Sequence, residues 1–422
     1  MAREIKDSGI EWIGEIPTDW SIGFAFQIFT PVKNRNIGLL ETNLLSLSYG
    51  KIKHKSINTT EGLLPESFDS YNIIECDDIV LRLTDLQNDH KSLRVGRSIE
   101  RGIITSAYLT LRPSNNSFSQ YMYFFFYSFD ICKGLYGMGS GVRQGLNWDD
   151  IKHLQILLPT LAEQQRIAAF LDRKCAEIDS VIADTQKTIE EYKALKQSII
   201  TEAVTKGVRG ERKMKDSGVE WIGDVPEEWE VTRIKNLFAY RNERNSLPLE
   251  DVNLISLYTD KGVVQHSDLE ETTGNKASNA DGYKLVYEND IVVNIILCWM
   301  GAIGRSAYNG VTSPAYDVYA PKAGTFSHFY HYYFRTQGFS GDCYKVGRGI
   351  MAMRWRTYSD QFRALSVIYP SIQEQIEIVT YLDRKCAEID RLIAAKQQLL
   401  TELGSYKKSV IYEYVTGKKE VL

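Results

Sequence analysis

"LDRKCAEID" occupies Leu171–Asp179 and recurs without a change at Leu382–Asp390. Each copy follows a related segment, "PTLAEQQ" from Pro159 and "PSIQEQI" from Pro370. An identity of this length within one chain indicates an internal duplication. The 422-residue chain is therefore expected to contain two similar units, each close to half its length.

A second repeated motif lies at the start of each half. "KDSGIEWIGEIPTDW" runs over Lys6–Trp20, and "KDSGVEWIGDVPEEW" runs over Lys215–Trp229. In both copies a serine stands three residues before a glutamate, which fits a capping box at the start of a short helix. The repeated tryptophans either plug an apolar pocket where a globule meets a helix or form a docking surface for a partner, and both can hold. They are Trp12, Trp20, Trp221 and Trp229.

The segments around the identical copies read as long helices. Apolar or small residues recur there in steps of three and four, which is a heptad seam. The first seam is Leu171, Cys175, Ile178, Ile182, Thr185, Ile189, Tyr192 and Ile199, and the second is Leu382, Cys386, Ile389, Ile393, Leu400, Leu403 and Val410. Lys196, Lys396 and Lys407 interrupt the seams. Each helix could run about 45 residues, or roughly 67 Å. We expect the two to pack as an antiparallel coiled coil; the alternative is a pair of ordinary core helices.

The centres of the halves have diverged and read as mixed α/β globules. Short β-rich runs such as "DDIVLRL" and "DIVVNII" are separated by turn residues, and "QYMYFFFYSF" and "HFYHYYFRTQ" read as buried aromatic helices. The predicted fold class is α+β, with two α/β globules in tandem joined by two long helices. The expected divisions are a first globule at 1–158, a helix at 159–206, a second globule at 207–369, a helix at 370–417 and a tail at 418–422.

Composition sets further bounds. The net charge is −4, so no global basic field exists, although a local basic stripe can still bind nucleic acid. The six cysteines contain no C-x-x-C pair and are expected to be reduced and buried. The N-terminus lacks an apolar signal region, and the longest apolar runs are too short or interrupted to span a bilayer. These features predict a soluble cytoplasmic protein.

Motifs for catalysis are missing. The sequence has no phosphate-binding G-x-x-x-x-G-K-[ST], no G-x-G-x-x-G and no H-E-x-x-H. No two prolines are adjacent, which removes the Asn/Asp-Pro-Pro-aromatic loop of an amino-methyltransferase. We therefore expect no catalytic centre, no metal site and no cofactor in this chain.

Local basic clusters remain. Lys51, Lys53 and Lys55 gather in the first globule, and arginines surround a glycine-rich turn in the second, "VGRGIMAMR". Arginine donates paired hydrogen bonds to phosphates and guanine edges, and glycine lets backbone N–H groups approach phosphates. Each cluster alone could be a solvated charged face. Because the first globule has a related glycine-rich turn, "GMGSGVRQG", nucleic acid is the favoured ligand.

Taken together, the "SG-EWIG-(I/V)P--W" motif, the "PTLAEQQRI" segment and the repeated heptad helix resemble the specificity subunits of type I restriction–modification enzymes. The resemblance covers both halves. It implies a non-catalytic subunit in which each globule reads one half of a bipartite, asymmetric DNA target and the helices set the spacing. It also implies that two modification subunits dock and methylate adenine, that restriction subunits translocate and cleave, and that S-adenosylmethionine, ATP and Mg are held by those partners.

The resemblance places DNA readers on both globules. The expected DNA-binding residues are Lys51, Lys53, Lys55, Arg82, Asn88, Ser140, Arg143, Gln144, Lys261, Asn294, Arg305, Arg348, Arg354 and Arg356. The expected partner-docking residues are Trp12, Trp20, Gln164, Gln165, Trp221, Trp229 and Gln375. The two glycine-rich turns differ, since Arg143-Gln144 gives way to Met351-Ala352, so contacts do not transfer one to one.

Two alternatives stay open. One is an adaptor that tethers protein partners without reading DNA, which salt-sensitive binding to duplex DNA would discriminate. The other is a recognition part of a self-sufficient methyltransferase or restriction enzyme, and the missing catalytic motifs argue against it for this chain.

Overall fold

A computed structural model describes residues 3–57, 67–89, 91–114, 117–138, 145–268, 279–349 and 355–421. The chain divides into two compact units, and each unit contains one globule with parts of both long helices. Unit 1 combines Met1–Gln186 with Gln398–Leu422, and unit 2 is Lys187–Gln397. The unit boundaries therefore cut across the helices instead of following their ends.

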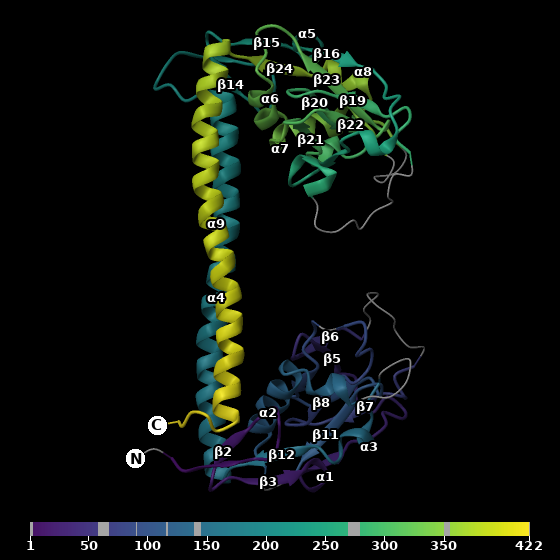
Figure 1. Ribbon diagram of the computed structural model, residues 1–422, viewed down its shortest axis with the longest axis vertical. Coiled ribbons are helices and arrows are strands. Elements are labelled where there is room, and N and C mark those ends of the chain that lie inside the picture. The colour runs from purple at the N-terminus through teal and green to yellow at the C-terminus, as the bar shows by residue number, and fades with distance from the viewer. Residues whose placement is uncertain are drawn as a thin grey trace. The chain divides into compact units, whose positions relative to one another are not determined.

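The heptad prediction is confirmed as two long helices, α4 (Leu161–Lys206) and α9 (Ile372–Val415), which Figure 1 shows side by side. The shared seam positions Leu171, Cys175 and Ile178 are buried, as are their equivalents in α9. In unit 1 the first part of α4 packs against the last part of α9, and in unit 2 the reverse holds, so the pairing is antiparallel in both.

The lysines that interrupt the seams have a structural reason. In unit 1 the Lys407 ammonium lies 2.6 Å from an Asp179 oxygen, and in unit 2 the Lys196 ammonium lies 2.7 Å from an Asp390 oxygen. Both aspartates end the identical "LDRKCAEID" segments. Such partly exposed ion pairs stabilise modestly, but they favour one helix register over others.

The first globule is a mixed sheet and helix assembly. Its two four-stranded sheets have the orders β6-β5-β10-β7 and β4-β11-β8-β9, with the hairpin β1-β2 and the antiparallel pair β12-β3 beside them. The elements are β1 (Ile5–Asp7), β2 (Glu15–Pro17), β3 (Ser21–Phe24), α1 (Ala25–Ile28), β4 (Phe29–Pro31), β5 (Leu44–Ser48), β6 (Lys51–Lys55), β7 (Asn72–Ile74), β8 (Ile79–Leu81), β9 (Val95–Arg97), β10 (Gly102–Ile104), β11 (Leu109–Pro113), α2 (Ser119–Ile131), η1 (Gly134–Gly137), α3 (Trp148–Ile151) and β12 (Gln155–Leu158).

The second globule repeats this plan. Its sheet β16-β23-β20-β21 matches β4-β11-β8-β9, and the pairs β15-β24, β17-β18 and β19-β22 complete it. The elements are β13 (Met214–Asp216), β14 (Asp224–Pro226), β15 (Glu230–Arg233), α5 (Ile234–Leu237), β16 (Phe238–Arg241), η2 (Leu249–Asp251), β17 (Ile255–Tyr258), β18 (Gly262–Gln265), η3 (His266–Asp268), β19 (Lys284–Val286), β20 (Ile291–Asn294), η4 (Cys298–Met300), β21 (Ile303–Arg305), β22 (Gly310–Thr312), β23 (Tyr316–Pro321), α6 (Ser327–Phe334), α7 (Gln337–Val346), α8 (Ser359–Ala364) and β24 (Ser366–Tyr369).

Aromatic helices form the centre of each core, as the sequence predicts. In α2, Phe125 and Phe126 are fully buried, and in α6 Tyr330 and Phe334 are too. The first core continues into α9, because the Tyr121 hydroxyl donates to the Val415 carbonyl over 3.1 Å. Each globule is thus anchored to the helix pair of its own unit through its aromatic helix.

The opening motif folds differently from its prediction. It forms a β-hairpin, β1-β2 in the first half and β13-β14 in the second, and no helix. The Ser8 hydroxyl accepts the Ile10 N–H over 3.1 Å, a local turn bond that competes with helix formation. Trp20 is 1% exposed, and its Nε1 donates to Glu163 at the start of α4 over 3.0 Å. The capping-box prediction is wrong, whereas the plug interpretation fits Trp20.

The cysteine prediction holds for four of the six. Cys175, Cys298, Cys343 and Cys386 are buried free thiols, while Cys76 and Cys132 are exposed. Burial raises the pKa of Cys175 to about 11, which keeps that thiol protonated at neutral pH.

Among the described helices, none is both long enough and apolar enough to cross a membrane.

The equivalent residues Trp20 and Trp229 offer a matched test of the hydrogen bond between a tryptophan and the glutamate of its long helix. Trp20 Nε1 donates to Glu163, whereas Trp229 Nε1 has no hydrogen-bond partner among the described residues. Both substitutions to phenylalanine remove similar volume. Trp20→Phe should therefore lower the free energy of unfolding by about 1–3 kcal/mol more than Trp229→Phe, since only the first loses a bond to a charged acceptor. Denaturant unfolding followed by circular dichroism measures this, and equal losses would contradict it.

Candidate nucleic-acid interface

A lysine-bearing hairpin, β5-β6, forms one edge of a sheet in the first globule. Tyr49 and Gly50 join its strands with φ of 48° and 76°, the two-residue turn whose twist matches a hairpin. Exposed lysines on β6 lie opposite residues of β5, in the pairs Lys51 with Ser48, Lys53 with Ser46 and Lys55 with Leu44. Successive side chains of a strand alternate between its two faces, so the three lysines, at every second position of β6, line one side of the hairpin.

This hairpin has the chemistry for a DNA groove. A two-stranded ribbon fits the major groove, and lysines neutralise phosphates. Tyr49 is 75% exposed at the turn. Lys51 Nζ lies 3.8 Å from an Asp179 oxygen, but Lys53 and Lys55 make no ion pair with the described residues.

The connection between β8 and β9 holds two more predicted readers. Arg82 is half-buried, and its Nη2 donates to an Asp89 oxygen over 2.7 Å. Asn88 is exposed and donates to Asp85, which adopts a positive φ of 59°. Arg82 thus shapes the loop, while Asn88 and the exposed Gln87 lie at its surface. Side-chain amides of this kind suit adenine edges.

Predicted readers of the second globule fall in different environments. Lys261 is exposed at the β17-β18 turn. Asn294 is only 6% exposed, and its Oδ1 accepts the Ile296 N–H over 3.0 Å, so it shapes the turn after β20 and is not presented at the surface. Arg305 is half-buried and donates to Asn289 over 2.8 Å.

Two exposed arginines stand together at the base of the second glycine-rich turn. The backbones of Arg348 and Arg356 exchange hydrogen bonds of 2.8 and 3.0 Å, which form a β-bridge. Trp355 beside them stacks on Tyr344 with ring centres 5.1 Å apart. A side chain at Gly347 would meet Trp355 Nε1 and would displace the indole from its place on Tyr344. Ser140, Arg143, Gln144 and Arg354 lie outside the described residues.

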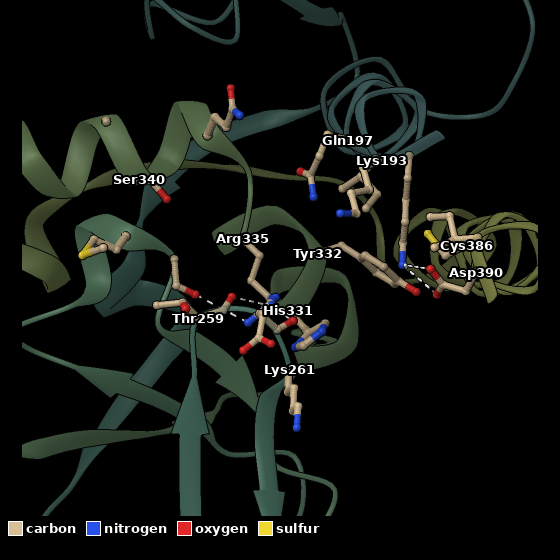
Figure 2. Close-up of a pocket in the computed structure, with 18 of the residues that line it drawn as sticks. Lys193, Gln197, Thr259, Lys261, His331, Tyr332, Arg335, Ser340, Cys386 and Asp390 are labelled. Atoms are coloured by element: carbon tan, nitrogen blue, oxygen red, sulfur yellow. Dashed lines mark hydrogen bonds and ion pairs between the residues drawn. The ribbon is translucent and has the colours of Figure 1, made fainter. Parts of the chain in front are cut away.

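Unit 2 also contains a cleft of about 1210 Å³ between the globule and the helix pair. Figure 2 shows Lys261 and Arg335 on the globule side and Lys193 on the helix side. Within it, burial and the Arg335 charge lower the pKa of His331 to about 3, so the imidazole is neutral. Its Nδ1 accepts the Arg305 N–H over 3.2 Å, which orients the start of the loop after β21.

Comparison of the chain with known protein families identifies the family to which it belongs. The "Type I restriction modification DNA specificity domain" matches residues 100–193 and 226–403, which is more than half of the chain and includes part of each globule. This chain belongs to that family.

Curated relatives agree with the assignment. A specificity subunit of the type I restriction enzyme MjaX from Methanocaldococcus jannaschii is 28% identical over 235 residues, covering 53% of this chain and 54% of the relative. The MjaVIII specificity subunit of the same organism is 28% identical over 141 residues, covering 33% and 31%. The matched region thus spans about half of one relative and a third of the other.

Solved structures share the fold. A chain from a structure on "complex assembly" and "conformational transition of the type I R-M system" has a TM-score of 0.70 at 13% identity, covering 96% of this chain and 99% of that one. The HsdS subunit from Thermoanaerobacter tengcongensis has a TM-score of 0.53 at 12% identity, covering 98% and 100%. Tandem globules with two long helices are therefore the fold of this type I specificity family member.

Most residues predicted to dock partners have internal roles in this specificity-family chain. Trp20 and Trp229 are each 1% exposed. Trp12 packs on Phe125 with ring centres 5.7 Å apart, and Trp221 Nε1 donates to Asp342 over 2.7 Å.

The glutamines after the prolines also act internally. Gln164 is 2% exposed; its Oε1 accepts the Phe118 N–H over 2.9 Å, and its Nε2 donates to the Pro159 carbonyl over 2.9 Å. Gln375 makes the equivalent bonds to Phe326 and Pro370, both over 2.8 Å. Each glutamine therefore joins the start of an aromatic helix to the start of a long helix. Gln165 is exposed and remains available to a partner.

Tyr49 and Gln87 lie inside the expected reader segments Ser46–Lys55 and Arg82–Asn88, although the sequence does not single them out as individual readers, and both are exposed. The pair Tyr49-Gly50 between two alternating runs is a turn pattern that could have indicated the hairpin tip. Gln87 has no comparable indication, because only the folded loop places it outside.

Neighbouring glutamines separate an internal role from a docking role. Gln164→Leu should lower the free energy of unfolding by about 2–4 kcal/mol, because it leaves the Phe118 N–H and the Pro159 carbonyl unpaired. Gln165→Leu should change stability by less than about 0.5 kcal/mol. Thermal and denaturant unfolding measure both, and a fully stable Gln164→Leu chain would return Gln164 to the docking set.

Proposed function

We propose that this chain is the DNA sequence-recognition subunit of a type I restriction–modification complex. Each globule reads one half of a bipartite, asymmetric duplex target, and the helix pair sets the distance between the halves. The observation that carries the proposal is the match of the DNA specificity family to both halves of the chain. The lysine face of β5-β6 and the paired Arg348 and Arg356 support it, because both are exposed and positively charged.

The proposed complex supplies the chemistry that this chain does not. Two modification subunits would hold S-adenosylmethionine and methylate adenine, and restriction subunits would use ATP and Mg to translocate and cleave DNA. The specificity subunit itself has no catalytic role in this proposal. Its contribution is to choose the sequence to which the partner enzymes are delivered.

Exposed apolar residues on the helices are candidate docking positions for the two modification subunits. In unit 1 the large exposed apolar residues away from the helix ends are Val181 on α4 and Tyr406 on α9, exposed by 48% and 50%, while Leu161 lies at the start of α4. In unit 2 the equivalent positions are Leu392 on α9 and Leu195 on α4, exposed by 43% and 48%. The same pair of positions therefore recurs once in each unit, as two copies of one partner require.

Salt dependence tests DNA reading by the first globule. Replacing Lys53 and Lys55 together with glutamine should weaken binding of the assembled complex to all duplexes. It should also reduce the slope of log K against log salt by about one for each phosphate that the variant no longer neutralises. Lys152→Gln is the control, since Lys152 pairs with Asp149 in the same globule away from the hairpin.

An unchanged salt slope in the double variant would remove the hairpin from the interface. Binding of the wild-type complex that shows neither salt dependence nor sequence preference would instead favour a protein adaptor over a DNA reader.

Docking is tested by placing a charge on one apolar position at a time. Val181→Asp should yield complexes that carry one modification subunit, and so should Leu392→Asp, because an aspartate buried in an interface is costly. Gln186→Asp adds the same charge at an exposed position elsewhere on α4. Native mass spectrometry counts the subunits, and full assembly of both apolar-site variants would contradict these docking positions.

A further inference from the structure

Each globule contains a shielded arginine whose guanidinium binds backbone carbonyls. In the first globule Arg94 is fully buried. Its Nη1 donates to the carbonyls of Thr84 over 2.7 Å and Arg82 over 3.2 Å. Its Nη2 donates to those of Asp85 over 3.0 Å and Asp89 over 2.5 Å. All four carbonyls belong to the connection between β8 and β9, so one buried side chain fixes the backbone of that loop from the core side.

The second globule has a counterpart from a different element. Arg335 follows α6 and is half-buried. Its Nη2 donates to the carbonyls of Thr259 and Asp260, both over 2.9 Å, and its Nη1 donates to that of Ile303 over 3.1 Å. Figure 2 shows it reaching the backbone at Thr259. It therefore joins the β17-β18 turn, next to Lys261, to the strand that leads to Arg305.

Neither guanidinium forms an ion pair with a described carboxylate. The buried Asp130 accepts the backbone N–H of Arg94 over 2.8 Å and not its guanidinium. Burial lowers the pKa of Arg335, and the nearby Asp260 offsets this only in part. A shielded charge that costs desolvation and is met by neutral acceptors, mainly backbone carbonyls, is a demanding arrangement. This arrangement fixes the conformation of the loop, because a planar guanidinium can donate to several carbonyls at once.

We propose that Arg94 and Arg335 are the positioning residues for half-site recognition, Arg94 for the half read by the first globule and Arg335 for the half read by the second. They hold the loops that carry Asn88 and Gln87 in one globule and Lys261 and Arg305 in the other, without touching DNA. This inference rests on the proposed function and deepens it.

Arginine-to-lysine substitutions test the arrangement directly. Lysine keeps the charge, but its donors radiate from one nitrogen and cannot span the carbonyls. The assembled wild-type, Arg94→Lys and Arg335→Lys complexes are compared on a duplex library in which each half-site is varied in turn. Arg101→Lys and Arg233→Lys are the controls, because both arginines are exposed and neither binds these loops. Thermal unfolding of every variant is recorded alongside.

We expect Arg94→Lys to reduce discrimination at one half-site by roughly tenfold and to leave the other unchanged, and Arg335→Lys to do the converse. Tyr136→Phe is a milder variant of the first site, since the Tyr136 hydroxyl accepts from Arg94 Nε over 3.0 Å and donates to the Asp89 carbonyl over 3.1 Å. It should reduce discrimination at the same half-site, but by less than Arg94→Lys does. This variant keeps the test decisive if Arg94→Lys does not fold.

Equal losses at both half-sites, or wild-type discrimination in all three variants, would overturn the inference. A wild-type complex that prefers no bipartite target would refute the proposed function itself, which separates the two failures.

Discussion

The structure depends on a buried carboxylate at the first turn of each long helix. Glu163 is 7% exposed and Glu374 is 3% exposed, so each must be paired. Glu163 accepts from Arg3 over 2.7 Å and from Trp20 over 3.0 Å. Arg212 Nη2 lies 2.5 Å from Glu374, although without the alignment of a hydrogen bond. These pairs tie the hairpin that opens each half to its long helix.

This attachment of each opening hairpin to its long helix explains why the edges of the two halves stayed alike while their centres diverged. The hairpin, the glutamate, the glutamine beside it and the cross-helix pairs of Asp179 and Asp390 form one connected framework in each unit. Changing the glutamate or the glutamine leaves a buried polar group unpaired, which costs about 1–3 kcal/mol, whereas the partly exposed aspartate pairs contribute less. Exposed side chains of the loop between β8 and β9, such as Gln87 and Asn88, belong to no such framework and can change for a new target without breaking it.

The sequence predicts the duplication from its identical segments, the two long helices from their heptad pattern and the aromatic core helices from continuous aromatic runs. It does not predict which polar residues face inward. From the sequence alone Gln164 and Trp20 resemble surface docking residues. In the fold each instead forms an internal hydrogen bond at the start of a helix. Asn294 fails as a surface reader for the same reason, since its amide closes a turn. Arg94 is indistinguishable in sequence from a DNA-binding arginine, because its carbonyl partners converge only after folding.

In the proposed function, this chain chooses a bipartite DNA sequence for partner enzymes. Mapping adenine methylation across the genome of cells with and without the chain tests it most directly. One asymmetric motif, with two specified halves around an unread gap, should be methylated in the presence of the chain and unmethylated in its absence. An identical methylation pattern in both kinds of cell would contradict it.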